Sequence, residues 1–131
     1  MSDRWARRRA LDQRVAEIVF GLHTKWVKRK RYGQPDDLAS PRLWVSDGVT
    51  RWLCPDYSWD LHAAGFVLQK MIELGFSVTI ENGLADGHLV WLVRFSERNG
   101  DYLVTVTDTE LPAAICEAAV AAMKYRKVAL A

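Results

Sequence analysis

The residues of this sequence that could do chemistry lie closest together between positions 58 and 62, where Ser58, Asp60 and His62 offer a hydroxyl, a carboxylate and an imidazole. A hydrolase uses such groups as nucleophile, orienting acid and base, and they must converge on one point. Groups spaced this closely at a helix start cannot readily converge, whereas Ser58 is well placed as a helix N-cap and Asp60 as an acidic residue of the first turn. We therefore predict a helix start here and a protein that is not an enzyme.

Metal, thiol and cofactor chemistry is likewise not indicated. Cys54 and Cys116 belong to no CxxC pair, and His23 and His88 have no partner at a metal-ligand spacing. The sequence contains no glycine-rich loop of the kind that cradles phosphates. We expect two reduced cysteines with a structural role, no metal and no cofactor.

A basic segment with one tryptophan follows the first predicted helix. Its members are Lys25, Trp26, Lys28, Arg29, Lys30 and Arg31. Cations beside a ring on which a base can stack are typical of nucleic-acid surfaces, and the three arginines at 7–9 could extend this one. The segment is therefore a candidate site for nucleic acid or another anionic partner. The alternative is a solvated flexible link, because no base-reading motif accompanies it.

Charge is divided unevenly along the chain. Residues 1–31 carry ten Lys and Arg against three Asp and Glu, a net +7, and the rest carry eight against thirteen, a net −5, so the overall +2 conceals a basic end on an acidic body. Such an end attracts polyanions or acidic surfaces. The 131 residues, half of them hydrophobic, suffice for one domain with its own core. Because no apolar run could span a membrane and no secretory signal opens the chain, we expect a cytoplasmic protein.

Periodicity and turn residues predict a single α+β domain over 1–131, with an antiparallel sheet of three to five strands sandwiched by helices. The expected order is helix, two strands, helix, three strands, helix. Residues 1–31 form a basic helix and segment, and residues 32–41 form a turn-rich linker. The helices are expected over 3–22, 59–75 and 109–129, and the strands over 42–45, 50–53, 76–81, 88–96 and 102–107.

Apolar stripes predict which faces are buried. In the first helix the stripe for burial comprises Leu11, Val15, Ile18, Val19 and Leu22, while Arg9, Gln13, Ala16 and Phe20 point the other way. The run 89–93 is apolar at every position, which indicates a central strand with helices on both faces of its sheet.

The second helix has two apolar faces. One is the expected core stripe of Leu61, Ala64, Leu68, Met71 and Ile72, and the other carries Trp59, His62, Ala63 and Phe66. We take Trp59, His62 and Phe66 as a candidate site for a protein partner, since exposed rings at this spacing make good interface anchors. The alternative is that the linker or the first helix covers this face.

The pattern Pro55-x-x-Ser58-x-Asp60-Leu61-x-Ala63-Ala64, followed by a helix, Gly75 and an aromatic-led strand, resembles the phage α/β/α sandwich domain, a family of small phage proteins. The segments 15–21 and 111–119, with Trp44 and Trp52, are similar to other landmarks of that family, and they follow in the same order. The resemblance implies a sheet sandwiched by helices and a phage or prophage origin, but no reaction, cofactor or catalytic residue. Trp59, His62, Phe66 and the basic segment depart from the family pattern.

Three functions follow as hypotheses. The first is a non-enzymatic phage-encoded protein that binds a host or phage protein, with counter-defence or host takeover as its role. The second is a nucleic-acid-binding module that uses the basic N-terminal third. The third is a site that sequesters a small anionic nucleotide.

Overall fold

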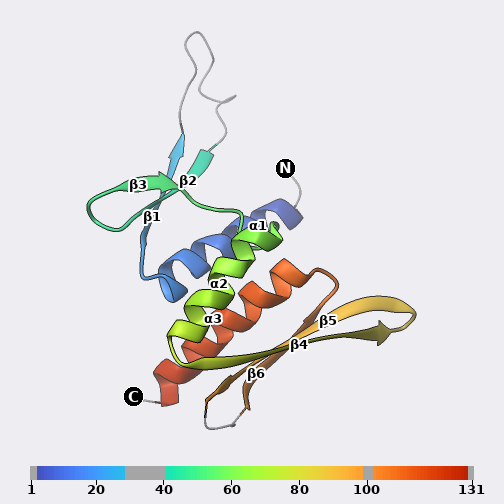
Figure 1. Ribbon diagram of the computed structural model, residues 1–131. Coiled ribbons are helices and arrows are strands. Elements are labelled where there is room, and N and C mark those ends of the chain that lie inside the picture. Colours follow the sequence, from blue (N-terminus) through green and yellow to red (C-terminus); the bar gives the residue numbers. More distant parts are fainter. Residues whose placement is uncertain (1–2, 29–40, 99–101, 130–131) are drawn as a thin grey trace.

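The computed structural model describes residues 3–28, 41–98 and 102–129, where two three-stranded antiparallel sheets lie on either side of a layer of helices (Figure 1). The predicted α+β class is confirmed, with one strand more than expected and with the strands divided between two sheets. The elements are α1 (Asp3–Arg14) continued by a π-helical turn (Val15–Val19), β1 (His23–Lys28), β2 (Pro41–Ser46), β3 (Arg51–Leu53), α2 (Leu61–Glu73), β4 (Phe76–Ala85), β5 (His88–Glu97), β6 (Tyr102–Asp108) and α3 (Leu111–Ala129). No helix of the described residues is long and apolar enough to cross a bilayer.

The first helix is buried on more than its predicted stripe. Leu11, Val15 and Val19 are in the core as expected, but Arg9 and Ala16 are buried as well, so the prediction that these two point away from the core is wrong. In the π-helical turn, successive residues are rotated about the helix axis by a smaller angle than in an α-helix. The side chains after Arg14 therefore point in other directions than an α-helical pattern predicts. This turn contacts β1, α2 and α3, and only an element packed on several sides buries side chains all round.

The β1–β2–β3 sheet corrects the prediction of a link after the first helix. β1 pairs antiparallel with β2 from His23 opposite Ser46 to Lys28 opposite Pro41, so residues 25–28 are part of a strand. Between the predicted strands 42–45 and 50–53 the chain turns at Asp47, whose carboxylate accepts the backbone N–H groups of Val49 and Thr50. The rest of the predicted basic segment and linker, 29–40, lies outside the described residues.

The start of α2 differs from the prediction by two residues. Asp60 is the N-cap and accepts the backbone N–H of His62, whereas Ser58 is fully buried and donates its hydroxyl to the carbonyl of Arg8. The end of the helix is as predicted, since Gly75 adopts a φ of +97° that favours glycine. The buried face consists of Ala63, Ala64, Val67 and Met71. The predicted core positions Leu61 and Ile72 are exposed, because the true buried face is turned toward 63 and 67.

The β4–β5–β6 sheet is the predicted meander, with strand order β4-β5-β6. The two-residue turn is Asp86-Gly87, with φ of 52° and 78°, and Asn82 and Gly83 lie within β4. Both α2 and α3 pack on one face, so the expectation of helices on both faces of the run 89–93 is wrong (Figure 1). The small side chains of α3 allow close contact with Val93 and Phe95, which are fully buried. These small residues are Ala113, Ala114, Ala118, Ala119 and Ala122. On the opposite face Thr79 and Thr105 are exposed beside half-buried Arg94.

Candidate functional site

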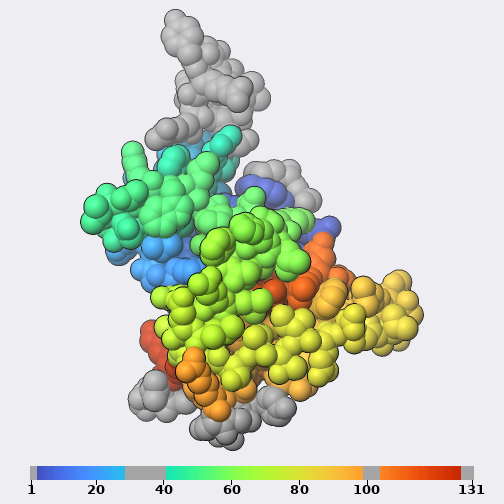
Figure 2. Space-filling model, in the orientation of Figure 1, coloured from blue at the N-terminus to red at the C-terminus, as the bar shows by residue number. Residues whose placement is uncertain are grey.

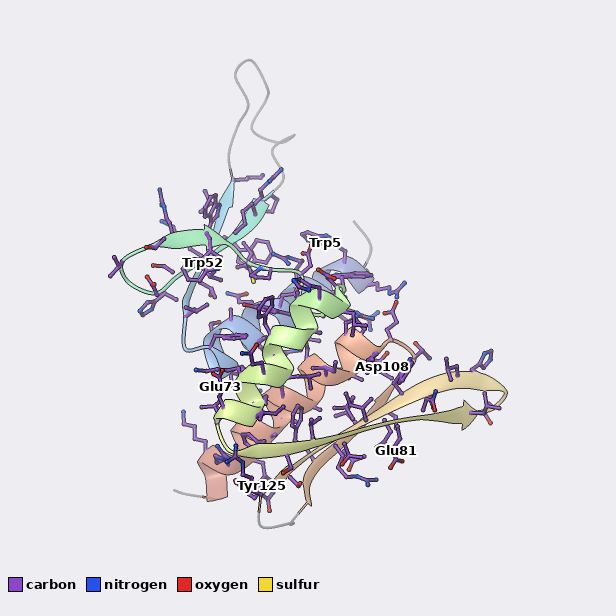
Figure 3. The ribbon with its side chains drawn as sticks, in the orientation of Figure 1. Trp5, Trp52, Glu73, Glu81, Asp108 and Tyr125 are labelled. Carbon is purple, nitrogen blue, oxygen red and sulfur yellow. The ribbon has the colours of Figure 1, made fainter. Side chains whose placement is uncertain are left out.

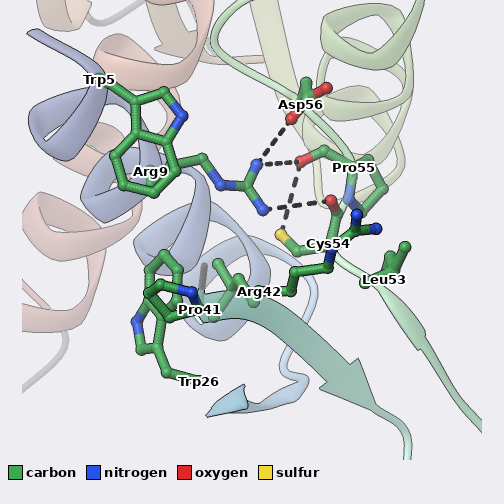
Figure 4. Close-up of a pocket in the computed structure, with 10 residues that line it drawn as sticks. Trp5, Arg9, Trp26, Pro41, Arg42, Leu53, Cys54, Pro55 and Asp56 are labelled. Atoms are coloured by element: carbon green, nitrogen blue, oxygen red, sulfur yellow. Dashed lines mark hydrogen bonds and ion pairs between the residues drawn. The ribbon is translucent and has the colours of Figure 1, made fainter. Parts of the chain in front are cut away.

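A buried polar network joins α1 to the connection between β3 and α2 (Figure 4). One Arg9 guanidinium nitrogen, Nη1, lies 2.8 Å from Asp12 Oδ2 and 2.8 Å from Asp56 Oδ1. The other Asp12 oxygen accepts the backbone N–H of Ser58 at 2.8 Å. Each of these charged groups therefore has a partner, as buried charges require. The network holds two segments together, and we assign it a structural role.

The titratable groups beside this network are not poised for catalysis. Burial raises the pKa of Asp12 above its ordinary value, against the opposing effects of the Ser58 hydrogen bonds and the Arg9 charge. Burial likewise raises the pKa of the Cys54 thiol to about 12 and also raises the pKa of Cys116. Both cysteines are buried and unpaired, so neither has the thiolate character of a nucleophile.

Ser58, Asp60 and His62 do not converge. The Ser58 hydroxyl is bonded to the Arg8 carbonyl, the Asp60 carboxylate caps α2, and the His62 ring lies edge-on to Phe66 at 5.3 Å between centroids. Among the described residues no group of three His, Cys, Asp or Glu side chains could hold a metal ion.

The strand β1 separates the residues that the sequence placed in one basic cluster. Side chains alternate along a strand, so Trp26 and Lys28 lie on one face of the sheet and Lys25 lies on the other. Trp26 faces α1, where its indole Nε1 donates to Gln13 Oε1 at 3.1 Å and its ring centroid is 6.3 Å from that of Trp5. These two rings and Arg9 line a groove of about 470 Å³ (Figure 4). Arg29, Lys30 and Arg31 lie outside the described residues.

A different set of cations gathers on the outer face of the β1–β2–β3 sheet. The register places Lys25 beside Trp44, Val27 beside Arg42, and Ser46 beside Arg51. The Arg51 guanidinium lies 5.9 Å from the centre of the Trp44 ring, next to a hollow of about 300 Å³. We call Lys25, Arg42, Arg51 and Trp44 the cationic sheet face; Arg42 also lines the groove beside Cys54 and Pro55 (Figure 4). These three cations form no ion pair within the described part of the chain.

Arg42, Arg51 and Trp44 are site residues that the sequence did not predict. Arg42 and Trp44 stand two positions apart, which puts them on one face of a strand, but their proximity to Lys25 depends on the pairing of β1 with β2. This proximity could have been predicted only if residues 23–28 had been assigned to a strand. The patterning of that segment, with two lysines three positions apart and no regular alternation of polar and apolar residues, does not distinguish a polar strand from a loop.

Three of the five arginines of α1 form ion pairs within the protein, while Arg7 and Arg14 are exposed and, with Arg4 and Arg8, line a hollow of about 590 Å³. Arg4 and Arg8 form ion pairs with Glu110, just before α3, and Arg9 belongs to the buried network. The guanidinium groups of Arg4 and Arg8 also lie 5.1 and 4.8 Å from the Trp59 ring centre. The proposed extension of the site through 7–9 is therefore wrong for Arg8 and Arg9.

The candidate partner-binding residues on and before α2 are exposed. Phe66 has 53% of its surface accessible, and Trp59 and His62 are also classed as exposed. The α1 arginines flank one of these rings, Trp59, without covering it. Five further exposed residues share this side of the helix: Leu61, Gly65, Gln69, Ile72 and Glu73. We call these five together with His62 and Phe66 the outer face of α2. The helix lies at the molecular surface in Figure 2.

Comparison with known proteins returns no match: no family model, no curated protein and no solved structure resembles the chain. The resemblance to phage α/β/α sandwich proteins therefore rests on the sequence motifs alone.

Proposed function

We propose that this protein is a binding protein without enzymatic activity, and that it engages a protein partner through the outer face of α2. The support is a set of large apolar side chains that the fold leaves uncovered. Leu61 and Phe66 are 55% and 53% accessible, and Ile72, the last residue but one of the helix, is also exposed. Apolar side chains gathered on one exposed surface, with few charges among them, are characteristic of interfaces.

Gly65 is the observation that carries this proposal. Glycine in the middle of a helix destabilises it by about 1 kcal/mol relative to alanine. A Cβ added at Gly65 would meet nothing within 4 Å, so nothing inside the described molecule requires glycine there. The residue leaves a dip between Leu61 and Phe66, into which a partner's backbone or side chain can approach closely.

The substitution Gly65→Ala tests the proposal, because it should change stability and partner binding in opposite directions. We expect Gly65→Ala to raise the free energy of unfolding by about 1 kcal/mol and to weaken partner binding, because the added methyl group fills the dip. The partner is recovered from bacterial lysate with the wild-type protein and then titrated directly against each variant. Phe66→Ala should weaken binding further, since truncation of an anchor ring typically costs about 2 kcal/mol or more of binding free energy.

Tyr125→Ala is the matched control for that titration, because Tyr125 is an equally exposed aromatic residue on α3. Partner affinity unchanged in Gly65→Ala and Phe66→Ala, or lost equally in Tyr125→Ala, would reject the outer face of α2. A role in counter-defence or host takeover is a further proposal that rests on the phage resemblance, and a bacterial identity of the recovered partner would support it.

The cationic sheet face supports a second candidate function, the binding of single-stranded nucleic acid. Lys25, Arg42 and Arg51 can neutralise phosphates, and the hollow beside Trp44 offers a place for a base. The only carboxylate in the described residues of this sheet and its turns is Asp47, whose oxygen is bonded to the backbone of its own turn. An anion approaching the outer face therefore meets mainly positive charge.

Salt titration distinguishes this second function from the first. Three phosphate contacts predict that the logarithm of the affinity for single-stranded DNA or RNA falls with the logarithm of salt with a slope of about −2. Arg51→Gln should reduce the slope by about 0.7, while Lys124→Gln, the same charge change on α3, should leave it unchanged. Absence of binding at low salt would exclude this function, and thermal stabilisation by mononucleotides alone would point to the small-nucleotide site instead.

A further inference from the structure

The strand β4 is an edge strand without the features that normally protect such edges. It is ten residues long, it contains no proline or lysine, and Glu81 is its single charged residue. The other sheet is different, since its edge strand β1 carries Lys25 and Lys28, and its second edge strand β3 is three residues long. Short length, lysine and proline are the usual means of preventing edge-to-edge pairing. The β4 edge has none of them.

The far end of β4 also projects from the body of the protein with apolar side chains uncovered. β6 pairs with β5 only from Trp91 onward, so the hairpin end formed by 83–90 is a two-stranded ribbon. Figures 1 and 2 show this end extending beyond the helices. Leu84 is 77% accessible, Leu89 opposite it is 50% accessible, and Ile80 is exposed. A two-stranded ribbon alone is marginally stable in water, so an apolar ribbon of this kind needs a neighbour.

We propose that two copies of the chain pair edge to edge through β4, antiparallel about a twofold axis at Asn82, to form one six-stranded sheet. In this register Ile80 of each copy lies opposite Leu84 of the other on the helix-covered face. Glu81 lies opposite Gly83 on the other face, toward which Figure 3 shows the Glu81 side chain pointing. The two exposed apolar residues of β4 thereby cover each other, and the two glutamates do not meet.

The directions of the backbone N–H and C=O groups of β4 support a twofold axis at Asn82. In an antiparallel ladder, alternate residues direct their N–H and C=O groups to opposite edges of the strand. The two-residue turn Asp86-Gly87 makes Ala85 and His88 the closing hydrogen-bonded pair, so Ile80, Asn82 and Leu84 direct theirs to the free edge. A twofold axis at Asn82 pairs these three residues among themselves.

Gly83 gives independent support for a second copy as the occupant. Glycine weakens a strand interior and often marks the close approach of another backbone. A Cβ at Gly83 would meet nothing within 4 Å, so no neighbour within the described residues accounts for it. In the proposed pair it faces the Glu81 side chain of the other copy, which gives that longer side chain room. The strand of an unrelated partner would not require that Gly83 and Glu81 of this chain suit each other, whereas a second copy does.

Disulfide cross-linking tests the register. Two Asn82→Cys copies would meet at the twofold axis, within the Cα separation of about 4.4–6.8 Å that a disulfide spans. Ser77→Cys is the control, because five residues on each side of the axis separate its two copies by about 34 Å. Cys54 and Cys116 are buried and give no background. We expect mild oxidation to give a covalent dimer with Asn82→Cys only. Equal cross-linking of both variants, or of neither, would overturn the proposal.

Sedimentation velocity tests the association without a cross-link. The wild-type protein should sediment with twice the 14.9 kDa mass of one chain. Leu84→Lys should shift it to the monomer mass, because the lysine would lie beside Ile80 of the other copy. Leu89→Lys, on the same face but one strand further from the edge, should remain dimeric, as should Gly65→Ala on α2. A wild-type monomer at high micromolar concentration, or dissociation by Leu89→Lys as readily as by Leu84→Lys, would reject the β4 pair.

Discussion

The two sheets of this protein have the same number of strands and the same antiparallel pairing, but they are joined to the helices by different interactions. The β1–β2–β3 sheet leads into α2 through a connection that the buried Arg9–Asp12 pair ties to α1. The β4–β5–β6 sheet rests on α3 through Phe76, Val93 and Phe95, which are fully buried. We call the Arg9–Asp12 pair, with its bond to Ser58, the polar anchor of the first sheet, which has the cationic outer face. We call the contacts of Phe76, Val93 and Phe95 with α3 the apolar anchor of the second sheet, which has the unprotected edge.

This difference indicates which kind of contact each sheet is suited to make. Lysines on the edge strand β1 discourage pairing with another strand and leave a charged face free for anions. The β4 strand carries one charge and several exposed apolar residues, which suits strand pairing with another chain. The same chain therefore presents an electrostatic surface at one end and an apolar edge at the other.

The largest expected effect concerns the apolar anchor. Phe95→Ala should lower the free energy of unfolding by about 4 kcal/mol, because it removes a fully buried ring from the contact with α3 and leaves a cavity. Urea unfolding measures this change. Phe66→Ala, the same substitution at an exposed position of α2, should change it by less than about 1 kcal/mol. Comparable losses in both variants would contradict the apolar anchoring of this sheet.

The polar anchor should be nearly as sensitive. Asp12→Ala leaves the Arg9 charge and the Ser58 N–H without their buried acceptor, and we expect a loss of about 3 kcal/mol in urea unfolding. Asp56→Ala removes a carboxylate that is two-thirds exposed and pairs with the same Arg9, so its effect should stay below about 1 kcal/mol. Equal losses of unfolding free energy in Asp12→Ala and Asp56→Ala would contradict the role of Asp12 as the buried acceptor.

A third variant measures the polar contacts of Arg126, which join α3 to the β4–β5–β6 sheet. Arg126 forms two hydrogen bonds of 2.9 Å to Glu97 and one of 2.7 Å to the Leu74 carbonyl, and its guanidinium lies 3.6 Å from the Phe76 ring centre. Arg126→Ala should cost about 2 kcal/mol of unfolding free energy, as expected for charge-assisted bonds at a half-buried site. Lys124→Ala, at an exposed position of the same helix, should have little effect on the melting temperature, and a similar drop in both would assign no special role to Arg126.

The smallest effect is the pH dependence that Asp12 contributes to stability. Burial holds the pKa of Asp12 above its unfolded value of 3.8, so the folded protein retains this proton to higher pH than the unfolded chain does. The resulting stabilisation is fully present below the unfolded pKa and is lost as pH rises through the folded pKa. Asp12→Asn cannot titrate, so its stability relative to the wild type should increase as the pH rises above the unfolded pKa of 3.8. Parallel pH profiles for the two proteins would contradict this assignment.

Local patterns in the sequence were sufficient for much of the fold. Periodicity and turn residues led to elements that the structure contains, among them the strands that begin at 76 and 88 and the helix that ends before Gly75. These features depend on backbone preferences and on side chains within one element, which act over a few residues. The helix start at Asp60 in place of Ser58 shows the limit, since Ser58 is drawn into the core by bonds to Arg8 and Asp12, about fifty positions earlier in the chain.

The candidate surfaces needed more than local patterns. The residues Trp59, His62 and Phe66 were selected from helical periodicity, and their exposure depended on which side α1 and α3 occupy. The basic cluster at 25–31 was selected from composition, and strand pairing placed Lys25 and Trp26 on opposite faces. Pairing also brought Arg42 and Arg51 to Lys25, which no nearby sequence signal indicated.

The amino-acid sequence by itself determined the class of fold, the position of most helices and strands, and the uneven distribution of charge, because each depends on residue type and short spacing. Tertiary structure alone decided which charges are neutralised, which apolar faces are covered and which strand is left at an edge. Those outcomes depend on contacts such as Arg9 with Asp56 and Arg126 with Glu97, between residues far apart in the chain, and such contacts exist only once the layers have packed.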